Sequence, residues 1–310
     1  MASGDTVSGL IRPFGLGPRV PMYVVSPWSK GGWVNSQVFD HTSVGQFLEK
    51  RFGVVIPAIT PWHRAVCGDL TSVFDFKAPN EPAFPELPDV SGASAVLLEH
   101  IQRPRILPPE RPEPLFQETG VRPSRSLPYE LNVIGSMDAV SSRLSLDFRN
   151  TGKAGAVFHV YDRLHLDHIP KRYTVEAGKT ISDVWDAKAD GGKYDLSVYA
   201  VNGFRRDIKG DMALAKAEIE VRYKPAQQKV QLVVRNSGSS TLALKIEHNA
   251  YGETGGELSL AAGVRSQREW SVADSGNWYD FTVSANGFMR RAAGRLETGK
   301  HGMSDPAMGT

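Results

Sequence analysis

The residues with the clearest potential for chemistry are histidines that lie next to aspartates. Asp40 precedes His41, and the stretch from Tyr161 to His168 holds two histidines and two aspartates. Imidazole groups titrate near neutral pH, and imidazole with carboxylate is a common zinc ligand set. An aspartate beside His41 could fix the tautomer of its ring. We therefore treat His41 as the candidate acid–base residue, with a role as a structural neighbour of a helix cap as the alternative.

The cluster that ends at His168 is weak evidence for a metal. On a strand, His165 and His168 would point in opposite directions, and on a loop no regular structure would fix them. We predict no metal site and no cofactor in this chain.

The loop from Ser26 to Gln37 is a candidate for binding a cationic headgroup. It carries Trp28, Lys30 and Trp33, and aromatic faces attract quaternary ammonium groups. The alternative is a surface loop with partly packed tryptophans.

An internal duplication dominates the rest of the chain. RNTG from Arg149 returns as RNSG from Arg235, and YDLSVYAVNGFRR from Tyr194 returns as YDFTVSANGFMRR from Tyr279. A period of about 85 residues is longer than a solenoid repeat and matches one small domain made twice. Apolar and polar residues alternate along these stretches, as in half-buried strands separated by glycine turns. We predict a mainly β chain with two tandem antiparallel β-sandwiches, residues 127–224 and 226–300.

Some repeat positions also suggest contacts. Trp185 and Trp270 occupy the same position in the two copies, which favours core packing. Trp278 stands where the first copy has Lys193, so we expect it to face outward. Together with Arg290 and Arg291 it is the candidate membrane or partner contact, and solvated turn charges are the alternative for the two arginines.

The composition excludes some classes of protein. The chain of 310 residues carries a net charge of +2, which gives no argument for nucleic acid. No apolar run reaches the roughly 20 residues that cross a bilayer. Cys67 is the single cysteine, so no internal disulfide can form. No signal peptide is visible, which predicts a cytoplasmic location for the chain as written.

The first 78 residues follow a different pattern. Pro21 to Val25 is an apolar run typical of a buried strand, and Asp40 to Gly53 is a predicted helix. Asp40, Thr42 or Ser43 could cap it, and Ser43 has Gln46 three residues later, as in a capping box. One strand and one helix do not make an α/β domain. We expect exposed apolar surface and disorder here.

Residues 79–126 form a predicted linker or packing arm, because residues 79–128 hold 11 of the 20 prolines. Only Ala93 to Ile101 reads as helix. Residues 301–310 form a tail.

Several stretches together resemble a known family. GLGPRVPMYVVSPWSKGGWVNSQVFDHTSVGQFLEKRFGV, ITPWHRAVCGDLTSVFDF, LPYELNV, AGAVFHVYDRLH, SGNWYDFTVSANGF and the final SDPAMG are similar to bacterial phosphocholine-preferring phospholipases C, relatives of the acid phosphatase A type phosphoesterases. The resemblance covers nearly the whole chain. It implies that residues 1–78 are the C-terminal remnant of an alkaline-phosphatase-like α/β core.

The resemblance also sets expectations about activity. The complete family enzyme is exported and hydrolyses phosphatidylcholine to diacylglycerol and phosphocholine at a metal-centred site. Its partners are the phospholipid or membrane surface and the rest of its catalytic domain, with no nucleic acid. The nucleophile and metal-ligand motifs of the family have no matching positions here, so we expect this truncated piece to be inactive alone. The alternative is a non-catalytic lipid-surface or protein-interaction module.

Overall fold

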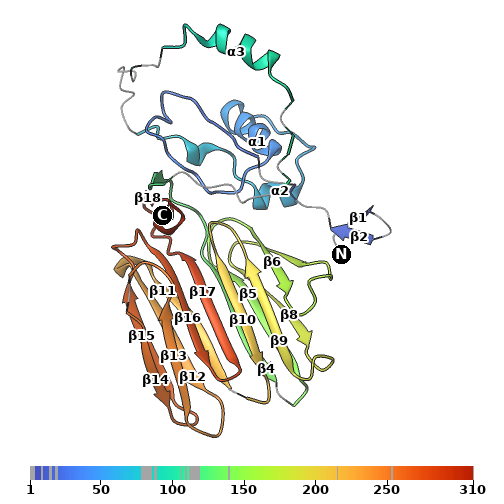
Figure 1. Cartoon of the computed structure of the whole chain (residues 1–310), viewed down its shortest axis with the longest axis vertical. Helices are drawn as coiled ribbons and strands as arrows, with labels where there is room; N and C mark the ends of the chain where they lie inside the picture. Colours follow the sequence, from blue (N-terminus) through green and yellow to red (C-terminus); the bar gives the residue numbers. More distant parts are fainter. Residues whose placement is uncertain are drawn as a thin grey trace.

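The computed structural model describes residues 4–7, 10–13, 16–17, 20–77, 86, 89–105, 107–108, 110–111, 119–138, 140–214, 216–252 and 254–309. A large block of antiparallel strands makes up most of the molecule, and a smaller part with short helices sits at one end of it (Figure 1). The prediction of a mainly β chain is confirmed. The C-terminus lies at the boundary between the two parts (Figure 1).

The first repeat copy is a sandwich of two sheets, which we call module 1. One sheet has the order β4-β5-β8, and the other contains β10-β9-β6-β7. The bounds are β4 Leu131–Asp138, β5 Arg143–Asn150, β6 Ala156–Asp162, β7 Lys171–Val175, β8 Lys179–Asp186, β9 Lys193–Tyr199 and β10 Arg205–Asp211.

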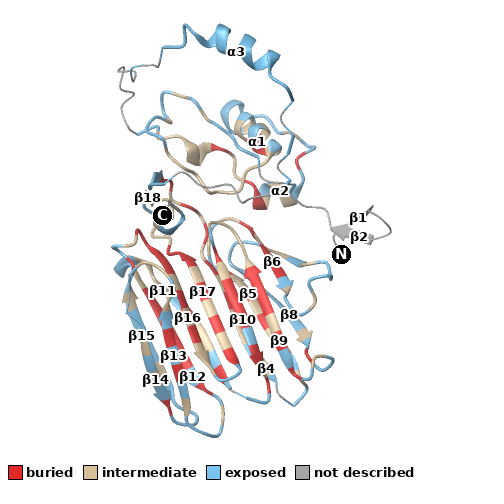
Figure 2. Cartoon of the chain, in the orientation of Figure 1, coloured by how far each residue is buried: buried red, intermediate tan, exposed pale blue. Residues whose placement is uncertain are grey.

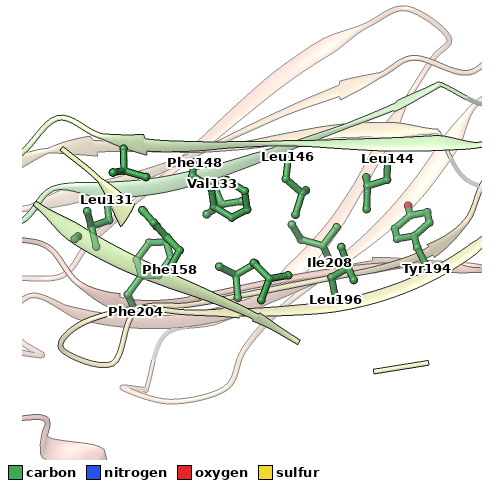
Figure 3. Close-up of a cluster of buried hydrophobic side chains, with 14 of the residues drawn as sticks. Leu131, Val133, Leu144, Leu146, Phe148, Phe158, Tyr194, Leu196, Phe204 and Ile208 are labelled. Atoms are coloured by element: carbon green, nitrogen blue, oxygen red, sulfur yellow. The ribbon is translucent and has the colours of Figure 1, made fainter. Parts of the chain in front are cut away.

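The core of module 1 follows from strand alternation. Leu144, Leu146 and Phe148 on β5 are each 0% exposed, because a strand turns every second side chain to the same face. They face Leu196 and Phe158 of the opposite sheet (Figure 3).

The second copy, module 2, repeats this arrangement. Its sheets are β11-β12-β15 and β17-β16-β13-β14. The bounds are β11 Ala217–Lys224, β12 Lys229–Asn236, β13 Leu242–His248, β14 Gly256–Leu260, β15 Arg265–Ser271, β16 Trp278–Ala285 and β17 Phe288–Arg295. We assigned residues 217–224 to the first sandwich, whereas β11 pairs with β12 along its whole length and so begins module 2.

The two modules share one sheet. β10 pairs antiparallel with β17, with Asp207 opposite Arg291, and this joins both modules in a continuous eight-stranded sheet. The buried residues run through both halves of that sheet (Figure 2). On the other face, Asn132 Nδ2 of β4 donates to the carbonyl oxygen of Val221 on β11 over 2.6 Å. The sequence pattern predicted two sandwiches but not this junction.

Short elements make up the smaller part of the molecule. They are the hairpin β1 Gly4–Val7 and β2 Leu10–Pro13, the helices α1 His41–Phe52, α2 Pro61–Val66 and α3 Ala93–Gln102, and the 3-10 turn η1 Thr71–Val73. Of two further 3-10 turns, η2 Pro225–Gln227 connects β11 to β12 within module 2, and η3 Pro306–Gly309 follows the modules. β3 Pro123–Ser124 pairs with β18 Gly302–Met303.

The predicted helix forms, and Asp40, one of the three predicted candidates, is its N-cap. Asp40 Oδ1 accepts from Thr42 N over 2.9 Å, and Ser43 Oγ accepts from Asp40 N over 3.1 Å. Asp40 and Ser43 therefore make the capping box that the sequence suggested for Ser43 and Gln46. Gly53 closes the helix with φ of 69°, a conformation that favours glycine.

The predicted strand at Pro21 to Val25 does not form, and these residues have no regular secondary structure. A strand is stable only when a neighbour satisfies its backbone groups, and no strand within the described residues pairs with this run. Tyr23 is 89% exposed, and Val44 on α1 is 47% exposed, so the expectation of exposed apolar surface is confirmed for these two residues, whereas Val24 and Phe47, which we also expected to be exposed, are half-buried.

Residues 34–77 nevertheless pack on module 1, so the expected disorder does not hold for them. Trp62 Nε1 donates to Thr174 Oγ1 over 3.0 Å, and Gly155 N donates to the carbonyl oxygen of Ala65 over 2.8 Å. Val34 N donates to the carbonyl oxygen of Pro123 over 2.9 Å. The predicted linker at 79–126 is described only in part. Within it α3 forms as predicted, with no buried residue.

Candidate functional site

The aromatic loop from Ser26 to Gln37 is held by hydrogen bonds to residues on either side of it. Ser29 Oγ donates to the carbonyl oxygen of Val24 over 2.9 Å, and Asp75 N donates to the carbonyl oxygen of Trp28 over 2.8 Å. Trp28 is 43% exposed and packs its ring 5.6 Å from that of Phe76. Lys30 is exposed. Trp28 and Lys30 thus lie on the surface, as a headgroup-binding rim requires.

Trp33 is different, because the protein supplies its own cation. The guanidinium carbon of Arg125 lies 4.2 Å from the centre of the Trp33 ring, and the His301 ring lies 5.0 Å away. Arg125 is 2% exposed, and burial lowers its pKa while the charge of Asp75 opposes that effect. An occupied aromatic face cannot also hold a ligand cation. Trp33 therefore joins the smaller part of the molecule to its C-terminal segment and does not form a free rim.

The imidazole that meets Asp40 belongs to His63, not to His41. His41 is the exposed first residue of α1. His63 Nε2 lies 3.5 Å from Asp40 Oδ2, and His63 Nδ1 lies 2.7 Å from Thr60 Oγ1. The expectation that Asp40 orients His41 is wrong. Consecutive residues of a helix point in different directions, and α2 instead brings His63 next to Asp40, the N-cap of α1.

The Asp40 carboxylate, the His63 imidazole and the Thr60 hydroxyl therefore lie in a row. Such a row can hold and pass a proton, but Thr60 is also the N-cap of α2 and accepts from His63 N over 3.4 Å. The signal for α2 was present in the sequence as Thr60 followed by Pro61, a cap followed by a favoured first residue. The approach of His63 to Asp40 has no periodic signature.

The loop between α1 and α2 is held by a carboxylate. Glu49 accepts two hydrogen bonds from Arg64, at 2.7 and 2.9 Å, and one from Ile56 N at 2.5 Å. The hydrogen bonds from Arg64 and Ile56 lower the pKa of Glu49 from 4.5 to about 2.

Cys67 lies at the end of α2 and is 4% exposed. Burial and the nearby charge of Asp40 raise the pKa of its thiol from 9.0 to about 12.

Of the three residues predicted to meet a membrane or partner, Trp278 and Arg290 are buried and Arg291 is half-buried. Trp278 is 5% exposed, and its Nε1 donates to the carbonyl oxygen of Met303 over 3.1 Å. The expectation that it faces outward is wrong, because the C-terminal segment covers it. Arg290 is 8% exposed, so it is not a solvated turn charge. Arg291 forms an ion pair with Asp280.

The tryptophans at matching repeat positions behave as expected. Trp185 and Trp270 are partly buried and pack against the cores of their modules. Lys171 Nζ lies 4.3 Å from the centre of the Trp185 ring.

The histidines near residue 165 come together, contrary to the sequence argument. His165 and His168 lie on the turn between β6 and β7, with ring centres 5.0 Å apart and planes 13° from parallel. Donor atoms of His165, Asp167 and His168 all lie within 4.8 Å of one another. This is the one group of potential metal ligands within the described ranges, and it lies outside the phosphoesterase-like segment.

Comparison with protein families divides the chain in the same order as the fold. A model described as the C-terminal domain of bacterial phospholipase C matches residues 123–211 and again residues 217–295, one match for each module. A model described as the phosphoesterase family matches residues 1–55.

Curated relatives extend over almost all of the chain. A non-hemolytic phospholipase C of Pseudomonas aeruginosa is 50% identical over 96% of this chain and 44% of its own length. A non-hemolytic phospholipase C of Burkholderia pseudomallei is 44% identical over 99% of this chain and 45% of its own length. A hemolytic phospholipase C of P. aeruginosa is 37% identical over 98% of this chain and 46% of its own length. The chain spans about half the length of the curated relatives it matches.

A crystal structure of red sea bream transglutaminase gives a TM-score of 0.19 at 12% identity, which carries no argument. In the described part of the chain, no helix is long and apolar enough to cross a membrane.

Proposed function

The chain belongs to the bacterial phospholipase C family, and on that premise we propose that it serves as the C-terminal portion of an exported phospholipase C. In this role the complete enzyme hydrolyses phosphatidylcholine to diacylglycerol and phosphocholine. The observation that supports the proposal is the order of the matches: a phosphoesterase segment at residues 1–55, followed by two copies of the C-terminal domain.

We further propose that the 310-residue chain has no phospholipase activity of its own. Hydrolysis of a phosphodiester needs a positioned nucleophile and groups that stabilise the charge of the transferring phosphoryl group. Within residues 20–77, the cluster around His63 offers proton transfer, and no group of three metal ligands gathers there. The family implies a metal ion in the complete enzyme. The described residues of this segment do not fit one, so we derive no step through it.

The role left to this chain is to carry and brace a catalytic domain. Residues 34–77 pack on module 1 through Trp62 and the backbone of Gly155. The exposed apolar residues Tyr23 and Val44 lie in the same segment, and apolar surface of this kind commonly marks a contact with another protein surface. We propose that this contact is with the rest of the catalytic domain.

The test compares the chain alone with a reconstituted enzyme. The purified 310-residue chain is incubated with phosphatidylcholine vesicles in two ways. It is used alone, and it is mixed with the part of the non-hemolytic P. aeruginosa phospholipase C that precedes the region similar to this chain. We expect diacylglycerol and phosphocholine only from the mixture. Products from the chain alone would overturn the proposed inactivity. A mixture that associates but cleaves no phosphatidylcholine would overturn the proposed substrate.

A second candidate function is a module that binds a lipid surface, and α3 favours it. Its apolar side chains Val96, Leu97, Leu98 and Ile101 are 53 to 70% exposed. Short apolar helical faces can enter the headgroup region of a bilayer. Sedimentation with phosphatidylcholine vesicles tests this, because Leu97→Asp with Leu98→Asp should abolish binding. Unchanged sedimentation of that double variant would exclude α3 as the lipid contact.

A further inference from the structure

The turn between β6 and β7 is held in place by its backbone and by neighbouring strands. His165 N donates to the carbonyl oxygen of Asp162 over 3.2 Å, and His168 N donates to the carbonyl oxygen of His165 over 3.0 Å. Arg163 N donates to the carbonyl oxygen of Asp195 on β9 over 2.8 Å. These bonds place positions 165 and 168 on the same side of the turn, although a strand would separate them.

The side chains on that side converge. Each of His165, Asp167 and His168 offers a donor atom within 4.8 Å of the other two. Four ligands at about 2.0–2.1 Å around a tetrahedral zinc ion lie about 3.3 Å apart. Metal binding requires side-chain rotations that bring the donor atoms from within 4.8 Å to about 3.3 Å of one another. Asp167 and His168 are exposed, so they can rotate without disturbing the core.

Asp190 supplies the support that metal-binding histidines usually have. Its Oδ1 lies 3.0 Å from His165 Nε2. A neutral imidazole that donates Nε2–H to this carboxylate keeps its lone pair on Nδ1. A carboxylate in this position fixes the ring orientation and the tautomer of a ligating histidine. Asp190 lies in the turn between β8 and β9, so the cluster joins two separate turns of module 1.

We propose that His165, Asp167 and His168 bind a divalent transition-metal ion such as Zn²⁺, with Asp190 as the positioning residue. Two imidazoles favour Zn²⁺, Cu²⁺ or Ni²⁺ over Mg²⁺ and Ca²⁺, which prefer all-oxygen sites. Three protein ligands leave a position for water. The site lies in module 1, away from the phosphoesterase-like segment, so its role is to cross-link two turns. It does not depend on the proposed phospholipase function.

The test is metal binding by the full chain without a purification tag. Equilibrium dialysis with Zn²⁺ should give one bound ion per chain, and X-ray absorption should show nitrogen and oxygen neighbours at about 2.0–2.1 Å. His168→Ala should abolish stoichiometric binding. Asp190→Asn, which keeps the shape of the positioning residue, should weaken binding by about 10- to 100-fold. His100→Ala on α3 is the matched control, and it should bind like the unaltered chain.

A second readout separates a built site from scattered surface histidines. Zn²⁺ should raise the midpoint of thermal unfolding for the unaltered chain and for His100→Ala, but not for His168→Ala. His168 and His100 are exposed, and Asp190 is half-buried and keeps its shape in Asp190→Asn. Each variant should therefore fold, as shown by an unchanged circular dichroism spectrum without metal. Equal losses in His168→Ala and His100→Ala, or no stoichiometric binding in the unaltered chain, would overturn the proposal.

Discussion

The Arg290 guanidinium donates a hydrogen bond to the Tyr194 hydroxyl over 2.9 Å, from module 2 to module 1. The same contact occurs in the reverse direction, because Arg206 of module 1 donates to Tyr279 of module 2 over 3.1 Å. Arg206 and Arg290 occupy one repeat position, and Tyr194 and Tyr279 occupy another. One interaction is therefore used twice at the junction of the modules.

These two arginines are buried beside aromatic rings and carbonyl groups. Arg290 Nη1 donates to the carbonyl oxygen of Lys209 over 2.7 Å, and its guanidinium carbon lies 4.2 Å from the centre of the Phe288 ring. Burial lowers the pKa of Arg290. Since a buried charge is tolerated only when its hydrogen bonds are satisfied, the modules must remain in register.

The first prediction concerns this junction. Arg290→Met removes the hydrogen bonds to Tyr194 and Lys209 and should lower the free energy of unfolding by about 2 kcal/mol. Urea denaturation of the full chain measures it. Lys209→Ala, which removes an exposed lysine from its ion pair with Asp195, should change stability by no more than about 0.5 kcal/mol. Combining Arg290→Met with Tyr194→Phe should show a coupling of about 1 kcal/mol. Equal effects of Arg290→Met and Lys209→Ala would contradict the assigned role.

The second prediction concerns the attachment of residues 34–77. A Cβ at Gly155 would lie 2.7 Å from the carbonyl oxygen of Ala65, so Gly155→Ala should push α2 off module 1. Limited proteolysis with mass spectrometry should then release residues 34–77 and leave the modules intact. Gly92→Ala is the control, because a Cβ there meets nothing within 4 Å. An unchanged fragment pattern in Gly155→Ala would show that this contact does not hold the segment.

The third prediction concerns Cys67. The thiolate is the reactive form of cysteine, and burial raises the pKa of this thiol to about 12. A disulfide reagent at pH 8 should modify Cys67 only after denaturation. Ser91→Cys provides an exposed thiol in the same chain as a reference for fast modification. If native Cys67 reacted as fast as that reference, the packing of α2 against α1 would be wrong.

The fourth prediction concerns acid stability. The pKa of Glu49 is lowered from 4.5 to about 2, with the Arg64 hydrogen bond as the largest cause. A lowered carboxyl pKa means that the ionised form stabilises the folded state. That contribution is complete above pH 4.5 and is lost as the pH falls through about 2. Glu49→Gln should therefore lower the thermal midpoint at pH 6.

The same variant should match the unaltered chain near pH 2. Glu99→Gln on α3 removes an exposed helical ion pair with Arg103 and is the control, for which we expect little change at either pH. A difference between Glu49→Gln and the unaltered chain that stays constant from pH 6 to pH 2 would refute the assigned ionisation.

Much of the fold could be predicted because its signal is local. The alternation at Leu144, Leu146 and Phe148 indicates a buried face, and all three side chains are fully buried. The junction of β10 and β17 could not be predicted in this way, since a strand pattern does not tell which edge will pair with which. The covering of Trp278 by Met303 likewise depends on where a later segment folds back.

The candidate site was less predictable than the fold. The proximity of Asp40 and His41 in the sequence favoured a pair that does not form, because His63 returns to Asp40 from a later helix. The argument against a cluster at His165 and His168 assumed a strand or an unfixed loop. The backbone bonds of the turn at Asp162 fix it instead. Both errors have one cause. Which side chains meet at these sites depends on where the chain reverses direction, and such reversals leave no periodic pattern in the sequence.

The pairing of β10 with β17 also limits how many copies can join in this way. Each module contributes the same edge of its sheet to the contact, so the arrangement is isologous, as in a two-fold symmetric dimer. A solenoid differs because each unit offers one surface forward and another backward, and it can grow without limit. Here the β10 edge of module 1 and the β17 edge of module 2 are both fully used in pairing with each other. The tandem pair is a covalently linked dimer that closes at two members, and a third copy appended to the chain would find no equivalent place to bind.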